Sequence, residues 1–118
     1  VATADVNSDG MIDIVVGSRK DDDGGNNRGA IYVLFLGSAS ATTIASHFKV
    51  SHTSGGFTAV LRDSDQLGIS VGTGDLNGDG VLEILGGAYS DDDGGTNTGA
   101  VYVLYRGSAS ATTIASHW

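Results

Sequence analysis

The sequence contains no cysteine and no proline, and it has only six lysine and arginine residues against fourteen acidic ones. Without cysteine, a disulfide scaffold and a thiolate-bound zinc or iron–sulfur site are excluded. Without proline, the nineteen glycines among 118 residues cannot form collagen. The net charge of −8 makes nucleic acid a poor partner, because phosphate binding needs clusters of basic side chains. No apolar run approaches the ~20 residues that span a membrane, and no signal peptide opens the chain at Val1.

The chain repeats itself with a period of 70 residues. Residues 1–48 align with residues 71–118, and 30 of the 48 aligned pairs are identical, whereas residues 49–70 have no second copy. The sequence therefore predicts about 1.7 copies of one structural unit. Such a unit must stack on a neighbour to bury its apolar face.

Short apolar runs that end at glycine predict strands rather than helices. These runs are rich in β-branched residues, and residues 67–73 alternate apolar with small side chains. Residues 39–46 are small and rich in serine and threonine, and we expect a connection there rather than a helix. Each period then holds about four antiparallel strands. The expected strands are residues 12–16, 30–36, 48–51, 67–73, 81–85 and 100–105, with a short extended piece at 57–61.

Two acidic loops of nine residues occupy equivalent places in the repeat. Residues 5–13 read DVNSDGMID, and residues 75–83 read DLNGDGVLE. Oxygen-bearing side chains stand at positions 1, 3, 5 and 9, and position 7 can offer its backbone carbonyl. Ca²⁺ accepts such oxygen sets in flexible geometry, whereas Mg²⁺ prefers a strict octahedron. The candidate ligands are Asp5, Asn7, Asp9, Met11 and Asp13 in the first loop, and Asp75, Asn77, Asp79, Val81 and Glu83 in the second.

Glycine at position 6 of each loop, Gly10 and Gly80, permits a tight turn. An EF-hand is disfavoured because its loop needs a glutamate at position 12, where this chain has Val16 and Gly86. The acid at position 9 is the expected bidentate ligand instead. Metal-free acidic turns are the alternative, since Asp, Asn and Gly also dominate turns. Two copies in register favour Ca²⁺, at about two ions per chain.

Two aspartate triplets, residues 21–23 and 91–93, each precede a pair of glycines. We interpret them as solvated hairpin loops, because adjacent aspartates cannot easily point at one ion. A second cation site or a ligand-facing loop is the alternative.

Together these motifs resemble the FG-GAP repeat, the blade unit of integrin α-subunit β-propellers and of many bacterial secreted or surface proteins. The FG element resembles residues 67–68, with Leu in place of Phe. The GAP element resembles residues 87–89 and, in degraded form, residues 17–19. Between these elements lies the calcium loop of the family, DxNxDGxxD, matched by residues 5–13 and, with Glu last, by residues 75–83.

The resemblance implies an all-β fold of two four-stranded antiparallel propeller blades. The first blade is expected over residues 1–48 with an incomplete first strand, a connection over 49–66, and the second blade over 67–118. A propeller usually has ~4–8 blades, and this chain supplies fewer than two. Either missing sequence or several copies complete the ring. We expect a homo-oligomer, with three chains giving six blades or four chains giving eight.

The function implied is a calcium-stabilised, non-enzymatic module for adhesion or protein interaction, outside the cell or at its surface. One alternative is a glycan-binding propeller in which Trp118, tyrosines and loop aspartates contact sugars. A hydrolase or lyase is a weaker alternative, because only Asp63 and Asp65 lie outside the repeated loops. His47 and His117 are repeat copies without a neighbouring nucleophile, so we expect them to serve architecture.

Overall fold

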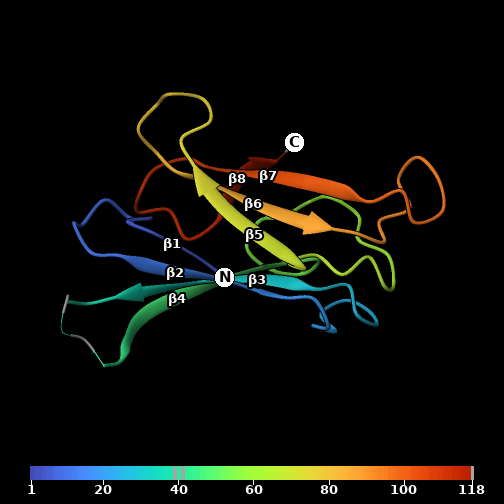
Figure 1. Ribbon diagram of the computed structural model, residues 1–118, viewed down its shortest axis with the longest axis horizontal. Helices are drawn as coiled ribbons and strands as arrows, with labels where there is room; N and C mark the ends of the chain where they lie inside the picture. The colour runs from blue at the N-terminus through green and yellow to red at the C-terminus, as the bar shows by residue number, and fades with distance from the viewer. Residues whose placement is uncertain (39, 41, 118) are drawn as a thin grey trace.

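The computed structural model describes residues 1–38, 40 and 42–117, and these residues form two four-stranded sheets (Figure 1). Within each sheet, every strand pairs antiparallel with the next along the chain. The predicted all-β fold of two four-stranded antiparallel sheets is confirmed. The first sheet contains β1 (Ala2–Ala4), β2 (Asp13–Ser18), β3 (Ala30–Leu36) and β4 (Ile44–Ser51). The second contains β5 (Ser70–Gly74), β6 (Glu83–Ala88), β7 (Ala100–Arg106) and β8 (Ile114–His117).

Several strand boundaries differ from the expected ones: β2 and β6 are displaced toward the C-terminus, and β1 and β8 were not among the expected ranges. Strand β4 begins at Ile44 rather than at residue 48, because β3 is long enough to pair with it as far as Leu36. The expected boundary between the first blade and the connection, at residues 48 and 49, therefore falls inside β4. Strand β5 begins at Ser70 rather than at residue 67. Residues 57–61 form no strand, and the part of the chain that is described contains no helix suited to crossing a membrane.

The core lies between the two sheets. Alternate residues of β2, β3 and β4 point toward the second sheet, and alternate residues of β6 and β7 point back. A Cβ atom placed on Gly86 would lie 2.5 Å from the Cδ1 atom of Ile31, which shows how closely the faces approach. The connection between the sheets adds Phe57, Leu61 and Leu67 to this layer. The strand residues of the layer are Val15, Ile31, Val33, Phe35, Phe48, Val50, Ile84, Ala88, Tyr102, Leu104 and Ile114.

The two sheets stack in the same sense rather than by equivalent faces. Ile31 of the first sheet is buried in the shared layer, whereas its repeat counterpart Val101 is 63% exposed on the far side of the second sheet. Tyr102 is buried in the layer, and its counterpart Tyr32 lies on the outer face of the first sheet. The outer face of each sheet is therefore equivalent, in the repeat, to the face that the other sheet buries in the shared layer. The two sheets do not close into a ring.

A close backbone contact joins a glycine of the first sheet to a glycine of the connection. A Cβ atom on Gly17 of β2 would lie 1.8 Å from the backbone oxygen of Gly68, just before β5. Gly68 also has a φ of 87°, which side-chain-bearing residues rarely adopt. Glycine is therefore required on both sides of this contact.

We expect Gly17→Ala to destabilise the protein by about 1–3 kcal/mol, because the methyl group would force two backbones apart. Gly87→Ala is the matched control in the second sheet, where the added Cβ would clash with the Oγ atom of Ser70, at 2.3 Å, and would make ordinary contacts of 3.6 Å with Ile69 Cγ2 and Ser70 Cβ. That hydroxyl can rotate away, so the control should cost less. Urea unfolding of both variants measures the difference, and equal losses would contradict this account of the contact.

Candidate metal-binding loops

The two nine-residue loops lie at the same end of the sheets (Figure 1). Loop 5–13 joins β1 to β2, and loop 75–83 joins β5 to β6. The aspartate triplets lie in the loops between β2 and β3 and between β6 and β7, at the opposite end. The repeat thus places one kind of acidic loop at each end of the stacked sheets.

Three side chains of loop 5–13 fold over its own backbone. Asp5 accepts hydrogen bonds from the N–H groups of Asp9 at 3.0 Å and of Gly10 at 2.8 Å. Asn7 also accepts from the Asp9 N–H, and its amide nitrogen donates to the Asp9 carboxylate at 2.9 Å. Asp9 in turn accepts from the Met11 N–H at 2.8 Å. Positions 1, 3 and 5 are therefore gathered around one turn, as the alternating pattern predicts.

Loop 75–83 has the same arrangement. Asp75 accepts from the N–H groups of Asp79 and Gly80, at 3.1 and 3.0 Å. The Asn77 amide donates to Asp79 at 2.8 Å, and Asp79 accepts from the Val81 N–H at 2.7 Å. Gly10 and Gly80 have φ angles of 86° and 83°, so glycine at position 6 does permit the turn.

The position-9 acids lie apart from the exposed turn, at the base of each loop. Asp13 is fully buried and accepts from the backbone N–H groups of Val6 and Leu36, at 3.0 and 3.2 Å. Glu83 is 1% exposed and accepts from the Leu76 N–H at 2.7 Å. These carboxylates tie the beginning of each loop to the strand that follows it. Bidentate metal ligation by Asp13 and Glu83 stays a prediction.

Whether the loops suit a cation depends on the atoms that they could offer as metal ligands. All side-chain donors are oxygens of the kind that Ca²⁺ prefers. The Oε1 atom of Glu83 is buried and has no hydrogen-bond partner among the described residues, so the second loop holds an unsatisfied carboxylate oxygen. No three acidic or histidine side chains of the described residues gather closely enough to form a metal site by themselves. A bound ion would therefore also need the asparagine and backbone oxygens.

Arg106 is a buried residue that the sequence reasoning missed. It lies on β7 and is 3% exposed. Its guanidinium donates to the carbonyl of Val6, to that of Leu82 at 3.4 Å and to that of Ala109 at 2.8 Å. Burial lowers the pKa of Arg106, although the nearby Glu83 and Asp13 oppose this effect. The sequence contains a sign of this role: Arg106 replaces the apolar Leu36 at the equivalent strand position of the first copy.

The first aspartate triplet holds an internal cation. The ammonium group of Lys49 lies 2.8 Å from Asp21 Oδ1 and 2.6 Å from Asp23 Oδ2, and 5.3 Å from the centroid of the Tyr32 ring. Burial alone would raise the pKa of Asp21, but hydrogen bonds from Lys49, the Asp23 backbone and Tyr32 lower it. The hydrogen bond from Lys49 also lowers the pKa of Asp23. Two of the three aspartates thus point at one cation, a lysine rather than a metal.

The second triplet has other partners among the described residues. Asp91 is buried and accepts from the Tyr102 hydroxyl at 2.7 Å. Burial, followed by this hydrogen bond, raises the pKa of Tyr102. Asp93 is instead paired with Arg62, at 3.1 Å on the surface. The two copies of this loop have therefore diverged in their charge partners.

The two aspartates outside the repeated loops lie in different environments, one at the surface and one buried. Asp63 pairs with Arg28 at 3.0 Å and is half-exposed. Asp65 is 2% exposed and accepts from the backbone N–H of Arg62, and burial raises its pKa. The histidines are also apart: His52 accepts from the Leu61 N–H at 3.2 Å, and His47 is exposed on β4. Trp118 lies outside the described residues.

Two four-stranded antiparallel meanders, stacked in the same sense and joined by one connection, are consistent with blades of the β-propeller type. Residues 67–104 match the family model of the FG-GAP repeat. The chain therefore carries an FG-GAP repeat in its second sheet, as the resemblance predicted, and the internal repetition relates the first sheet to it. None of the curated proteins matches the sequence significantly.

We expect Lys49→Met to destabilise the protein at pH 7 by about 1–3 kcal/mol, because Asp21 and Asp23 would lose their cation. A carboxyl with a lowered folded-state pKa stabilises above its unfolded pKa of about 3.9, and the stabilisation is lost as the pH falls through the folded value. The difference between wild type and variant should therefore shrink below about pH 4. Urea unfolding at several pH values tests this. Lys20→Met, at an exposed lysine, is the control, and a constant difference down to pH 2 would contradict the assignment.

Proposed function

We propose that the chain is a calcium-binding propeller-type repeat module that acts in adhesion or protein interaction and has no enzymatic activity. The observation that carries this proposal is the pair of acidic loops, which hold the same three side chains in the same arrangement at one end of the sheets. FG-GAP repeats often bind Ca²⁺, which supports the same interpretation.

The first ion would be held by Asp5, Asn7, Asp9 and the carbonyl of Met11, with Asp13 at the loop base. The second would be held by the matching set Asp75, Asn77, Asp79 and Val81, with Glu83 at the base. Bound Ca²⁺ supplies positive charge among carboxylates that otherwise repel one another. It would fix the turn from the first to the second strand of each sheet. Loops of this kind with Ca²⁺ affinities of ~10⁻⁴–10⁻³ M suit the outside of a cell or its surface.

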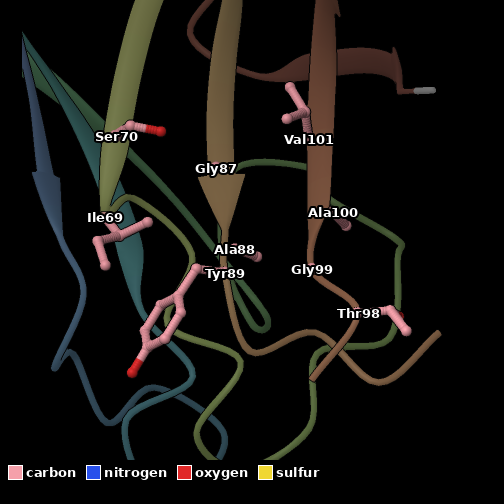
Figure 2. A pocket seen from close by; sticks show the side chains of 9 residues that line it. All are labelled: Ile69, Ser70, Gly87, Ala88, Tyr89, Thr98, Gly99, Ala100 and Val101. Carbon is pink, nitrogen blue, oxygen red and sulfur yellow. The ribbon is translucent and has the colours of Figure 1, made fainter. Parts of the chain in front are cut away.

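The positions of Asp63 and Asp65, the two acidic residues outside the repeated loops, favour a binding role over catalysis. Asp65 is buried and Asp63 is paired with Arg28, so the two do not form an open acid–base pair. Glycan binding is the second candidate, and one observation favours it: Tyr89 is 54% exposed beside a cavity in the second sheet (Figure 2). An aromatic ring in that place could stack on a sugar.

We expect wild-type protein to bind about two Ca²⁺ ions in isothermal titration calorimetry, and to gain about 2.7 kcal/mol of stability for each occupied site at a hundredfold excess over the Kd. Asp9→Ala and Asp79→Ala should each reduce the stoichiometry to about one, so each variant keeps the other loop as an internal control. If wild type shows no heat of Ca²⁺ binding and no shift of its melting curve with Ca²⁺, the proposal is wrong and the loops are metal-free acidic turns.

We also propose a homo-oligomer, because the outer faces of the two sheets carry partly exposed apolar side chains. Examples are Val16 and Leu34 on the first sheet, and Val101 and Val103 on the second. Exposed apolar faces of this kind mark interaction surfaces. Light scattering after gel filtration should give a mass of several chains, with three or four expected for a closed ring. A monomer with a cooperative thermal melt would refute the oligomer.

A further inference from the structure

The side chain of Arg106 lies between the two nine-residue loops and contacts the backbone of both. Its Nη2 atom donates a hydrogen bond to the carbonyl of Val6, the second residue of loop 5–13. Its Nε and Nη2 atoms each lie 3.4 Å from the carbonyl oxygen of Leu82, the eighth residue of loop 75–83. One guanidinium therefore joins a loop of the first sheet to a loop of the second.

The guanidinium is held in one position by neutral partners. Its Nη1 atom donates to the carbonyl of Ala109 at 2.8 Å and lies 3.5 Å from that of Ala111, both in the turn between β7 and β8. Each of its three nitrogens thus has a backbone carbonyl as partner, and the side chain is buried. The ion pairs formed among the described residues do not include Arg106. Its positive charge is therefore fixed in place but is not neutralised by direct contact.

Two buried carboxylates act on this charge at longer range, one from the base of each loop. They are Glu83 and Asp13, the acids at position 9. Burial lowers the pKa of Arg106, and the negative charges of Glu83 and Asp13 oppose this effect. Asp13 accepts backbone hydrogen bonds through both oxygens, whereas the Oε1 atom of Glu83 has no partner among the described residues. Because burial penalises a charged carboxylate, both acids gain from a cation shared between them.

The first sheet shows that its strand does not need a cation at this position. Leu36, the repeat counterpart of Arg106, pairs with β4 in the same meander as Arg106 pairs with β8. An apolar residue is therefore sufficient for the strand pairing, and the arginine is explained by the two loops that it contacts.

We propose that Arg106 is a positioning residue shared by the two candidate Ca²⁺ loops: it holds the base of both loops without a metal, and its fixed charge weakens Ca²⁺ binding to both. The weakening follows because the carboxylates that attract a cation are already partly compensated by the guanidinium, and like charges repel. This inference rests on the proposed function, since it concerns the same loops, but its first half can be tested without Ca²⁺.

The first test measures amide hydrogen exchange in the presence of a chelator. In Arg106→Met, exchange of the Val6 and Leu76 N–H groups, which donate to the position-9 acids, should accelerate at least about tenfold relative to the Gly99 N–H at the opposite end. Lys20→Met removes the same charge from an exposed site at that opposite end, and it should leave all three rates unchanged. Acceleration at one loop only, or at neither, would overturn the shared role.

The second test separates the charge of Arg106 from its hydrogen bonds. Arg106→Met and Arg106→Lys both lack the planar fork of donors, but only the lysine variant keeps the charge. Each is combined with Asp9→Ala or Asp79→Ala, so that one loop is titrated with Ca²⁺ at a time by calorimetry. We expect the methionine variant to bind Ca²⁺ at least about threefold more tightly than the lysine variant at each loop. Equal affinities, or a difference at a single loop, would contradict the proposal.

A measurement without any change at Arg106 covers the case in which these variants do not fold. In ¹⁵N-labelled Asp9→Ala and Asp79→Ala proteins, Ca²⁺ fills one loop each, and the Nε–H signal of Arg106 should shift in both. A shift in only one of them would overturn the proposal. If wild type binds no Ca²⁺, the proposed function and the effect on affinity are both wrong, and the hydrogen-exchange result alone decides whether Arg106 holds the two loops.

Discussion

The contact between the Gly17 and Gly68 backbones governs how the two sheets meet. A four-stranded sheet of short strands has two faces and cannot cover either alone. Here the segment that leads into β5 lies directly on β2, at a point where neither residue carries a side chain. The next residue back, Leu67, is buried in the layer between the sheets.

The carboxylates of the two nine-residue loops accept hydrogen bonds from the backbone around them. Asp5 and Asp75 accept from N–H groups inside their own turns, and Asp13 and Glu83 join each turn to its neighbouring strand. These hydrogen bonds hold each carboxylate in one orientation and fix the shape of the turn. The high acid content thus contributes to the architecture itself, in addition to the negative charge.

The repeat and the alternation of apolar residues predicted the sheets, their order and the loops that join them. These features are local, because a strand pattern or a turn glycine is visible within a few residues. The partners of Arg106 and Lys49 were not predictable. Arg106 contacts Val6 across 100 positions, and Lys49 meets Asp21 across 28. Such pairs depend on how the sheets twist and stack, which no local pattern encodes. The use of Asp13 as a backbone acceptor was also missed, because one of its two donors, Leu36, lies 23 residues further along the chain on β3.

Because Arg106 stands where the first repeat has Leu36, the two repeats are not interchangeable in their order along the chain. Within the chain, the guanidinium of the second sheet satisfies the Val6 carbonyl of the sheet before it. If a copy of the first sheet followed the second, Leu36 would stand in the place of Arg106. The carbonyl of Leu76 would then face an apolar side chain with no donor. The hydrogen bond from Arg106 to Val6 can therefore form when the second repeat follows the first, and not in the reverse order. This one side chain favours the observed order of the two repeats.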